Sequence, residues 1–309
     1  MKKLTTILLL SLCMVFILAA CTPAAPPAPA PAEETVEIAP TEAPLAPAAE
    51  PEPEPEPVTE PEPEPEPELS GKVQMSGSTS METVANALAE GFMLEHSGVS
   101  VDVQLGGSSV GVQDVQEGRS DIGNVSRELK DEETGLTPHI MAIDGIAIIV
   151  NPANPVTDIS KDDLIKVYTG EIKNWSDLGG NSEPIVVIGR EAASGTRGAF
   201  EELLKIQDEC QYAQELNETG AVKTSVSSTP AAIGYISLEA LDDTVIALDL
   251  DGAPATEEAI KAGEYALSRP FIMVTAEGEL RPEVQAFIDY VMGAQGQTIV
   301  ADNKLIAVA

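Results

Sequence analysis

Residues 72–96 read KVQMSGSTSMETVANALAEGFMLEH. Alternating apolar residues over 72–76 predict a short strand, and the spacing of apolar residues over 81–96 predicts an amphipathic helix that ends near Gly98. A turn of Gly, Ser and Thr separates the two. A strand followed directly by a helix is the unit from which parallel sheets are built, so this stretch indicates the fold class.

The same alternation continues toward the end of the chain. Further strands are expected over residues 99–105, 143–150, 185–189, 232–237 and 271–275. Further helices are expected over residues 110–117, 161–168, 198–204 and 282–294. The pattern predicts an α/β fold with helices on both faces of parallel sheets. About 240 residues, from Ser70 onward, are enough for two lobes with a sizeable core.

The N-terminus is typical of an exported chain. Lys2 and Lys3 precede a short apolar run, and Leu18-Ala19-Ala20-Cys21 resembles the lipobox of bacterial lipoproteins. We therefore expect residues 1–20 to be a signal peptide and Cys21 to be lipidated, which would anchor the protein on the extracytoplasmic face of the cell membrane. The alternative is an ordinary secretory signal with an incidental cysteine.

Residues 21–69 are expected to form a spacer. Residues 22–69 contain no Lys, Arg, Trp, Tyr or Phe, and from Pro51 onward Pro and Glu nearly alternate. Proline fixes φ near the polyproline II value, and too few apolar side chains are present to offset the entropy of ordering. This composition predicts an extended, disordered stalk rather than a partner-binding motif.

Charge and cysteine content exclude several functions. The chain has 17 basic and 51 acidic residues, and its net charge is −34. Such a balance argues against nucleic-acid binding. Cys210 is the single cysteine after the expected anchor, so no internal disulfide is available. Two histidines without clustered cysteines favour no transition-metal site, and no cofactor is expected.

Four turns carry the features of an anion site. Small hydroxyl residues and glycines stand where strands give way to helices. A helix N-terminus offers unpaired N–H groups and a positive dipole end, glycine allows close approach, and Ser or Thr adds a hydroxyl donor. Arginine accompanies two of the turns. The turns are Gly77–Ser80, Gly106–Gly111, Asp121–Arg127 and Arg190–Arg197.

In this order, and together with Ile143-Asp144-Gly145, Asn174-Trp175, Ile233-Gly234-Tyr235 and Ser268-Arg269-Pro270, the turns resemble the phosphate-specific transport (PstS-type) substrate-binding proteins. The resemblance spans residues 72 to about 300. One departure is Ser109, which stands where that family usually has glycine. The resemblance implies a type II periplasmic-binding-protein fold, with two lobes joined by two crossing strands.

The resemblance also implies boundaries and roles. Lobe 1 would comprise residues 70–150 and 240–309, and lobe 2 residues 151–239. The crossings would fall near Ile149–Asn151 and between Ser237 and Ser268. The expected phosphate-binding residues are Thr79, Ser80, Ser108, Ser126, Arg127, Asp144, Arg190, Ser194, Gly195 and Thr196. The expected partners are inorganic phosphate and the permease and ATPase subunits of an ABC phosphate importer, and the domain is expected to be monomeric.

Asp144 is the candidate for distinguishing phosphate from sulfate. Near neutral pH phosphate keeps an O–H group, which a carboxylate would accept, whereas the same carboxylate repels sulfate. Asp144 lies in an apolar strand, where a carboxylate must be paired or functional. It could instead pair with Arg127 or Arg190 as a scaffold, and Asp121 is the weaker alternative acceptor.

The alternatives to phosphate capture are an enzyme, a binding protein for another oxyanion, and a surface adhesin or sensor module. An enzyme is not expected, because neither His96 nor His139 lies in a turn where it could activate Ser194. The same fold could bind another oxyanion, such as sulfate, molybdate or a phosphonate. The long stalk would also suit a surface adhesin or sensor module.

Overall fold

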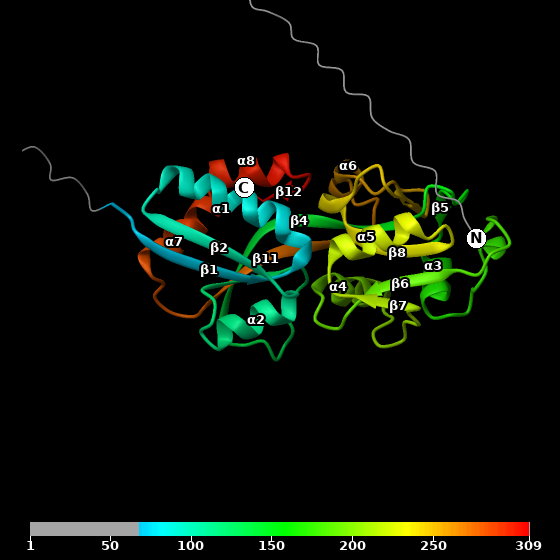
Figure 1. Ribbon diagram of the computed structural model, residues 1–309, viewed down its shortest axis with the longest axis horizontal. Helices are drawn as coiled ribbons and strands as arrows, with labels where there is room; N and C mark the ends of the chain where they lie inside the picture. The colour runs from blue at the N-terminus through cyan, green and yellow to red at the C-terminus, as the bar shows by residue number, and fades with distance from the viewer. Residues whose placement is uncertain (1–67, 309) are drawn as a thin grey trace, which may run out of the picture. The chain divides into compact units, whose positions relative to one another are not determined.

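The computed structural model describes residues 68–308; the expected signal peptide, anchor and most of the stalk lie outside them. One sheet runs through both lobes in the order β2-β1-β3-β11-β4-β8-β6-β7, with β12 and β9 also paired to β4. Figure 1 shows β4 passing from one lobe into the other. The predicted α/β alternation is confirmed, and the sheet is mixed because β4 and β11 run antiparallel to their neighbours.

Lobe 1 is formed from both ends of the described chain. Its elements are β1 (Gly71–Gly77), the 3-10 helix η1 (Thr79–Met81), α1 (Glu82–Glu95), β2 (Val99–Leu105), α2 (Ser108–Gln116), β3 (Ile122–Val125), the first part of β4 (Leu136–Val150), β11 (Ser268–Ala276), α7 (Pro282–Met292), α8 (Ala294–Asp302) and β12 (Ile306–Ala307). Helices α1, α7 and α8 bury one face of the sheet, and α2 covers the other (Figure 1).

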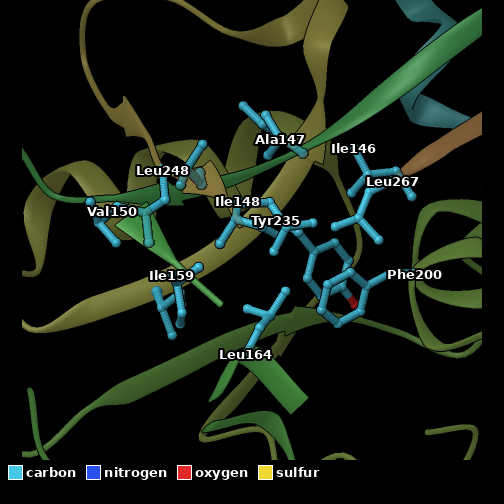
Figure 2. Packing of buried hydrophobic residues seen from close by; sticks show 14 of the residues in the cluster. Ile146, Ala147, Ile148, Val150, Ile159, Leu164, Phe200, Tyr235, Leu248 and Leu267 are labelled. Carbon is cyan, nitrogen blue, oxygen red and sulfur yellow. The ribbon is translucent and has the colours of Figure 1, made fainter. Parts of the chain in front are cut away.

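Lobe 2 is formed from the middle of the chain. Its elements are the second part of β4, β5 (Asp158–Ile159), α3 (Lys161–Tyr168), η2 (Trp175–Leu178), β6 (Val186–Arg190), α4 (Gly195–Leu204), β7 (Gln214–Leu216), α5 (Thr219–Ser228), β8 (Ala232–Ser237), η3 (Leu238–Ala240), β9 (Ile246–Ala247), β10 (Asp249–Leu250) and α6 (Glu257–Lys261). Its core packs Ile148, Leu164, Phe200 and Tyr235 together (Figure 2).

The packing differs from the expected lobe boundaries. Along β4, Gly145 is opposite Ser268 of β11, whereas the next residue, Ile146, is opposite Ser237 of β8. Residues 146–150 and 238–267 contribute to the lobe 2 core rather than to lobe 1. The crossing expected near Ile149–Asn151 therefore lies earlier in the chain. The apolar run belongs to one strand, β4, which contributes side chains to both cores, and Asn151-Pro152 follows the end of that strand. We propose residues 146–267 as lobe 2.

Candidate functional site

The first two turns project hydroxyl groups between the lobes. Ser78 caps η1, where its Oγ accepts from the backbone N–H of Ser80 at 3.3 Å. Gly107 precedes α2 with φ +88°, and a Cβ there would meet the lobe 2 carbonyl oxygen of Ala193 at 2.7 Å, so only glycine fits. Ser108 follows as the first residue of α2 and is fully buried.

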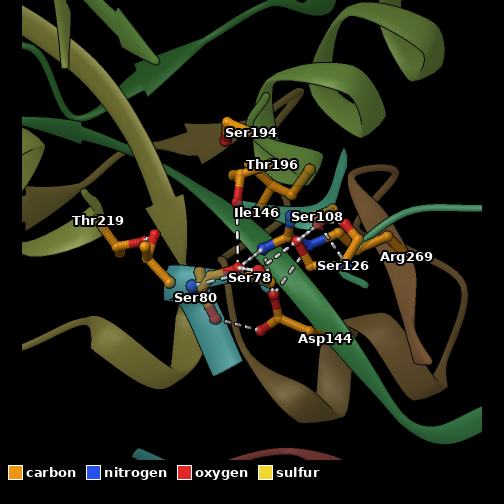
Figure 3. Close-up of polar contacts among 12 residues, drawn as sticks. Ser78, Ser80, Ser108, Ser126, Asp144, Ile146, Ser194, Thr196, Thr219 and Arg269 are labelled. Atoms are coloured by element: carbon orange, nitrogen blue, oxygen red, sulfur yellow. Dashed lines mark hydrogen bonds and ion pairs between the residues drawn. The ribbon is translucent and has the colours of Figure 1, made fainter. Parts of the chain in front are cut away.

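Hydroxyl side chains from both lobes meet where these turns converge (Figure 3). This hydroxyl cluster comprises Ser78, Thr79, Ser80, Ser108, Ser126, Thr196 and Thr219. Ser78 Oγ donates to Ser126 Oγ at 2.7 Å, and Ser108 Oγ lies 3.3 Å from Ser126 Oγ. From lobe 2, Thr196 Oγ1 donates to Ser80 Oγ at 3.2 Å. The cluster is thus closed by groups from opposite lobes.

Arg190 places a cation beside the cluster. It ends β6, and its guanidinium donates to Thr79 Oγ1 at 2.8 Å and to Thr219 Oγ1 at 3.1 Å. Its other two bonds go to the carbonyl oxygens of Leu216 and Asn217. Burial lowers the pKa of Arg190 to about 10, which still leaves it charged at neutral pH. Within residues 68–308 no carboxylate forms an ion pair with it.

Arg269 places a second cation beside the hydroxyl cluster, at Ser80 and Ser126. Its Nη2 donates to Ser80 Oγ at 3.3 Å, and its Nη1 donates to the carbonyl oxygen of Ser126 at 2.8 Å. The same guanidinium binds the Oδ2 atom of Asp144 with Nε and Nη2, at 3.1 and 2.9 Å. Ser237 donates to the other carboxylate oxygen at 2.8 Å. Asp144 is therefore paired with Arg269, and with neither Arg127 nor Arg190.

The charges of this buried pair oppose the effect of burial. Burial raises the pKa of Asp144 and lowers that of Arg269, while the attraction between the two charges counters both shifts. Two buried guanidinium groups, those of Arg190 and Arg269, lie at the hydroxyl cluster together with one carboxylate, that of Asp144, which is paired with Arg269. The site therefore has an excess of positive charge in a strongly acidic protein, as an anion site requires.

Arg127 does not join the cluster. Its guanidinium forms a two-pronged ion pair with Glu133, at 2.7 and 2.8 Å, and donates to Ser109 Oγ at 3.3 Å. It lines a separate pocket of about 530 Å³ and packs against Gly198 of lobe 2. The expectation that Arg127 contacts the anion is not supported by this geometry, because the buried guanidinium is already paired with a nearby carboxylate.

The remaining predicted residues lie at or beside the cluster. Ser194 caps α4, where its Oγ accepts from the backbone N–H of Arg197, and Gly195 faces Ser108 and Ser126. Asp121 is not placed to accept the phosphate proton. Its carboxylate accepts the backbone N–H of Gln74 and forms an ion pair with Arg281. Ser109 lies inside α2, where its backbone N–H donates across the lobes to Ala193, so the absence of glycine there is tolerated.

Sequence reasoning assigned no role to four residues that the structure places here. They are Ser78, Thr219, Ser237 and Arg269. Arg269 had a usable signal, since a cation inside an otherwise apolar strand must be paired or functional. Thr219 had none, because it belongs to a helix, α5, that the sequence pattern did not predict.

Residues 68–308 contain neither a candidate metal site nor a candidate membrane-spanning helix. No group of three or more His, Cys, Asp or Glu side chains there could hold a metal ion. Nor does that part of the chain contain a helix with the length and apolar character to cross a membrane.

Glu239 joins the two lobes through a hydrogen bond. From η3, its Oε1 accepts the backbone N–H of Val84 in α1 at 2.8 Å, while Oε2 is buried without a partner among the described residues. Burial and the neighbouring charge of Asp144 raise the pKa of Glu239 to about 8. The folded state therefore retains a proton that the unfolded state, with a pKa near 4.5, releases.

We predict that Glu239 makes the free energy of unfolding depend on pH. The stabilisation by its retained proton is fully present at pH 4 and is lost as the pH rises from about 4.5 to about 8. Glu239→Gln should remove the dependence and, relative to wild type, gain about 1–3 kcal/mol between pH 5 and pH 8. Urea unfolding at several pH values measures this. Glu90→Gln, on the exposed face of α1, is the control and should leave the profile unchanged. Parallel profiles for wild type and Glu239→Gln would contradict the prediction.

The fold and the site define a class of protein. A sheet that continues through two lobes, with polar groups converging between them, is the type II periplasmic-binding-protein fold. Residues 62–295 match the family model described as a PBP superfamily domain.

Comparison with known proteins narrows the class. The phosphate-binding protein PstS of Bacillus subtilis (strain 168) is 38% identical over 248 residues, which cover 77% of this chain and 81% of that protein. A Clostridium perfringens structure with bound phosphate, named as a phosphate ABC transporter substrate-binding protein, is 42% identical with a TM-score of 0.76, and the match covers 77% of this chain and 100% of that one. An ABC-type phosphate transport receptor from Vibrio cholerae is 32% identical with a TM-score of 0.65, over 77% and 100% of the two chains. The chain belongs to the PstS family of phosphate-binding proteins.

Proposed function

We propose that this protein captures inorganic phosphate in the hydroxyl cluster and delivers it to an ABC phosphate importer. One observation carries the proposal: Arg190 is only 2% exposed, yet among residues 68–308 its guanidinium is bonded solely to neutral oxygens. A buried cation without a counter-ion is costly, and a bound anion would supply the missing charge. The names of the relatives support phosphate as that anion.

The roles follow from the contacts. Hydroxyl groups of Thr79, Ser80, Ser108, Ser126 and Thr196 would donate to phosphate oxygens, together with backbone N–H groups at the α2 and α4 N-termini. Arg190 and Arg269 would supply charge and directional donors. Ser194 would hold the α4 N-terminus, and Gly195 would allow phosphate and the opposite lobe to approach it closely.

For Asp144 we propose an indirect role. Its Oδ2 accepts two N–H groups of Arg269, its Oδ1 accepts the hydroxyl of Ser237, and the backbone N–H of Glu239 also stabilises the carboxylate. These donors occupy the lone pairs of the carboxylate. Asp144 would therefore position Arg269 rather than accept the phosphate O–H, and the acceptor of that proton would be a serine or threonine oxygen of the cluster.

Calorimetric titration with phosphate, sulfate and methylphosphonate at several pH values tests the proposed ligand. We expect phosphate to bind more tightly than sulfate, because its O–H group can donate to a hydroxyl oxygen of the cluster and sulfate has no proton to donate. Equal affinity for sulfate, or preference for methylphosphonate, would replace phosphate with another oxyanion. Failure of all three anions to bind would favour an adhesin or sensor.

The protein is proposed to act as a carrier without catalysis. The relatives are substrate-binding proteins of transport systems. Ser194 Oγ accepts a backbone N–H, His139 contacts Thr275, and His96 packs on Phe92. No histidine of the described residues hydrogen-bonds a serine of the site, and such a base is what a serine nucleophile requires. Turnover of a phosphomonoester would overturn this proposal.

Membrane attachment is proposed from the sequence alone. Cys21 and the stalk lie outside the described residues, and the lipobox resemblance supports a diacylated cysteine that tethers the binding domain to the outer face of the cell membrane. Metabolic labelling with palmitate tests this. Wild type should incorporate label and Cys21→Ser should not, and equal labelling of the two would exclude Cys21 as the anchor.

A further inference from the structure

A polar ring lies at the edge of the lobe 2 core, against the main chain of Arg190. It consists of Arg197, Glu201, Tyr212 and Tyr235, together with the main chain of Arg190. Tyr235 is fully buried and Glu201 is 6% exposed. None of these four side chains is bonded to the hydroxyl cluster, so the proposed function does not account for them.

The hydrogen bonds that lead from the Arg190 N–H through the two tyrosines to Glu201 all run in one direction. The backbone N–H of Arg190 donates to Tyr235 Oη at 3.2 Å, and Tyr235 Oη lies 3.1 Å from Tyr212 Oη. Tyr212 Oη donates to Glu201 Oε1 at 2.9 Å. Because an amide N–H can only donate and a carboxylate can only accept, each tyrosine must donate toward Glu201. Burial raises the pKa of both tyrosines, so both keep the proton that this arrangement requires.

Arg197 closes the ring. Its Nε pairs with Glu201 Oε1 at 2.8 Å, and its Nη1 donates to the carbonyl oxygen of Arg190 at 2.9 Å. Its guanidinium also lies over the Tyr212 ring, 4.9 Å from the centroid. Both main-chain polar groups of Arg190 are thus held by one network, while the Arg190 side chain extends from the same residue to Thr79 of the opposite lobe.

Packing prevents the ring from shifting. Tyr235 stacks on Phe200 of α4 with centroids 4.2 Å apart and planes 14° from parallel. Tyr212 lies against the main chain of Gly189, where a Cβ would meet its Cδ1 at 2.2 Å. Two phenylalanines would fill the same volume without needing partners, so the core itself does not require the hydroxyl groups. Fully satisfied buried networks instead fix one arrangement of the chain.

We propose that Tyr235, Tyr212, Glu201 and Arg197 are positioning residues, which set the main chain of Arg190 so that its guanidinium meets the bound anion. This inference rests on the proposed function, since the anion probe is inorganic phosphate. Tyr235 is the decisive member because, of the four side chains in the ring, it is the one that contacts the Arg190 N–H. Removing the Tyr235 hydroxyl leaves the Arg190 N–H without this acceptor, while the ion pair of Arg197 and Glu201 stays intact.

The test compares Tyr235→Phe with Tyr265→Phe. Tyr265 is similarly buried in the lobe 2 core, and its hydroxyl bonds a different main-chain group: it donates to the carbonyl oxygen of Ile146 and does not contact Arg190. Both variants should lose similar thermal stability, whereas phosphate affinity should fall about tenfold for Tyr235→Phe and less than twofold for Tyr265→Phe. Should Tyr235→Phe fail to fold, Tyr212→Phe replaces it, with an expected loss of about threefold.

Two further measurements separate positioning from a general loss of stability. In an Arg190→Gln background, Tyr235→Phe should change phosphate affinity less than twofold, because the group it positions is gone. In the wild type without added anion, hydrogen exchange at the Arg190 backbone N–H and Nε–H should be slow, and Tyr235→Phe should accelerate both while Tyr265→Phe does not. Hydrogen exchange is measured without ligand. A wild type that fails to bind phosphate would therefore overturn the proposed function, and the exchange rates would still test whether Tyr235 positions Arg190. Unchanged exchange, or an equal affinity loss in the Arg190→Gln background, would overturn the inference.

Discussion

Replacing Gly195 by alanine should weaken phosphate binding by at least about 100-fold. Gly195 is the first residue of α4, and a Cβ there would lie 2.1 Å from Ser108 Oγ and 2.7 Å from Ser126 Oγ. Both serines belong to the opposite lobe, and Ser108 is held by the backbone N–H of Ser126. The lobes could therefore no longer close to the observed separation, and donors on either side would not reach one anion together.

Gly220→Ala is the matched control for this prediction. Gly220 also lies in the first turn of a lobe 2 helix, α5, but a Cβ there would meet no atom within 4 Å. Alanine in a helix is favourable where space allows, so we expect this variant to bind like wild type and to unfold within about 2 °C of it. Calorimetry and thermal unfolding of both variants measure the difference. Affinities that agree within about threefold would show that the lobes need not approach this closely.

Replacing Arg269 by methionine should cost about 3–5 kcal/mol of folding stability, the largest loss we predict. Arg269 and Asp144 are opposite one another on β11 and β4 and are 3% and 1% exposed. Without the guanidinium, Asp144 would be a buried carboxylate with only Ser237 and a backbone N–H as partners. Phosphate affinity should also fall, because Ser80 and the carbonyl of Ser126 lose their shared donor.

Two comparisons make the Arg269 prediction specific. Arg119→Met removes the ion pairs of a half-exposed arginine with Asp114 and Glu117, and it should cost no more than about 1 kcal/mol. Asp144→Asn in the Arg269→Met background should recover part of the loss, because the unpaired charge is then absent. Urea unfolding near neutral pH measures all four proteins. A loss for Arg269→Met similar to that for Arg119→Met would mean that the buried pair is not ionised or not important.

The parts of the site that follow local rules could be predicted from the sequence. Strand-to-helix turns with Gly, Ser and Thr indicated Thr79, Ser80, Ser108, Ser126 and Thr196, and the structure brings these hydroxyl groups together. The rule is local because a helix N-terminus leaves its N–H groups unpaired wherever it occurs in the fold. The α/β alternation was predictable for the same reason, since apolar periodicity needs no tertiary information.

The two arginine assignments show where local rules fail. Arg127 follows Ser126 directly, yet its side chain is paired with Glu133 rather than directed into the cluster. Arg269 reaches the cluster because β11 pairs with β4 in a register that sets it opposite Asp144. That register joins residues 125 positions apart, so no pattern around Arg269 alone could predict the partner.

Strand continuity and weak helices account for the other differences. The apolar run that includes residues 146–150 was expected to end lobe 1, but the single strand β4 crosses both cores. Thr219 was missed because α5 is rich in Ser, Thr and Val, which have low helix propensity. Tertiary packing of Val222 and Val226 stabilises that helix instead.

We propose that an inorganic oxyanion binds between the lobes, against Arg190 and Arg269. The most direct test is a crystal structure of the protein with arsenate, a tetrahedral analogue of phosphate whose arsenic atom is located by anomalous scattering. We predict one strong peak within hydrogen-bonding reach, through the arsenate oxygens, of the hydroxyl cluster and the Arg190 guanidinium. A peak at another place, such as the pocket lined by Arg127 and Arg197, or no peak at an arsenate concentration that saturates binding in solution, would contradict the account.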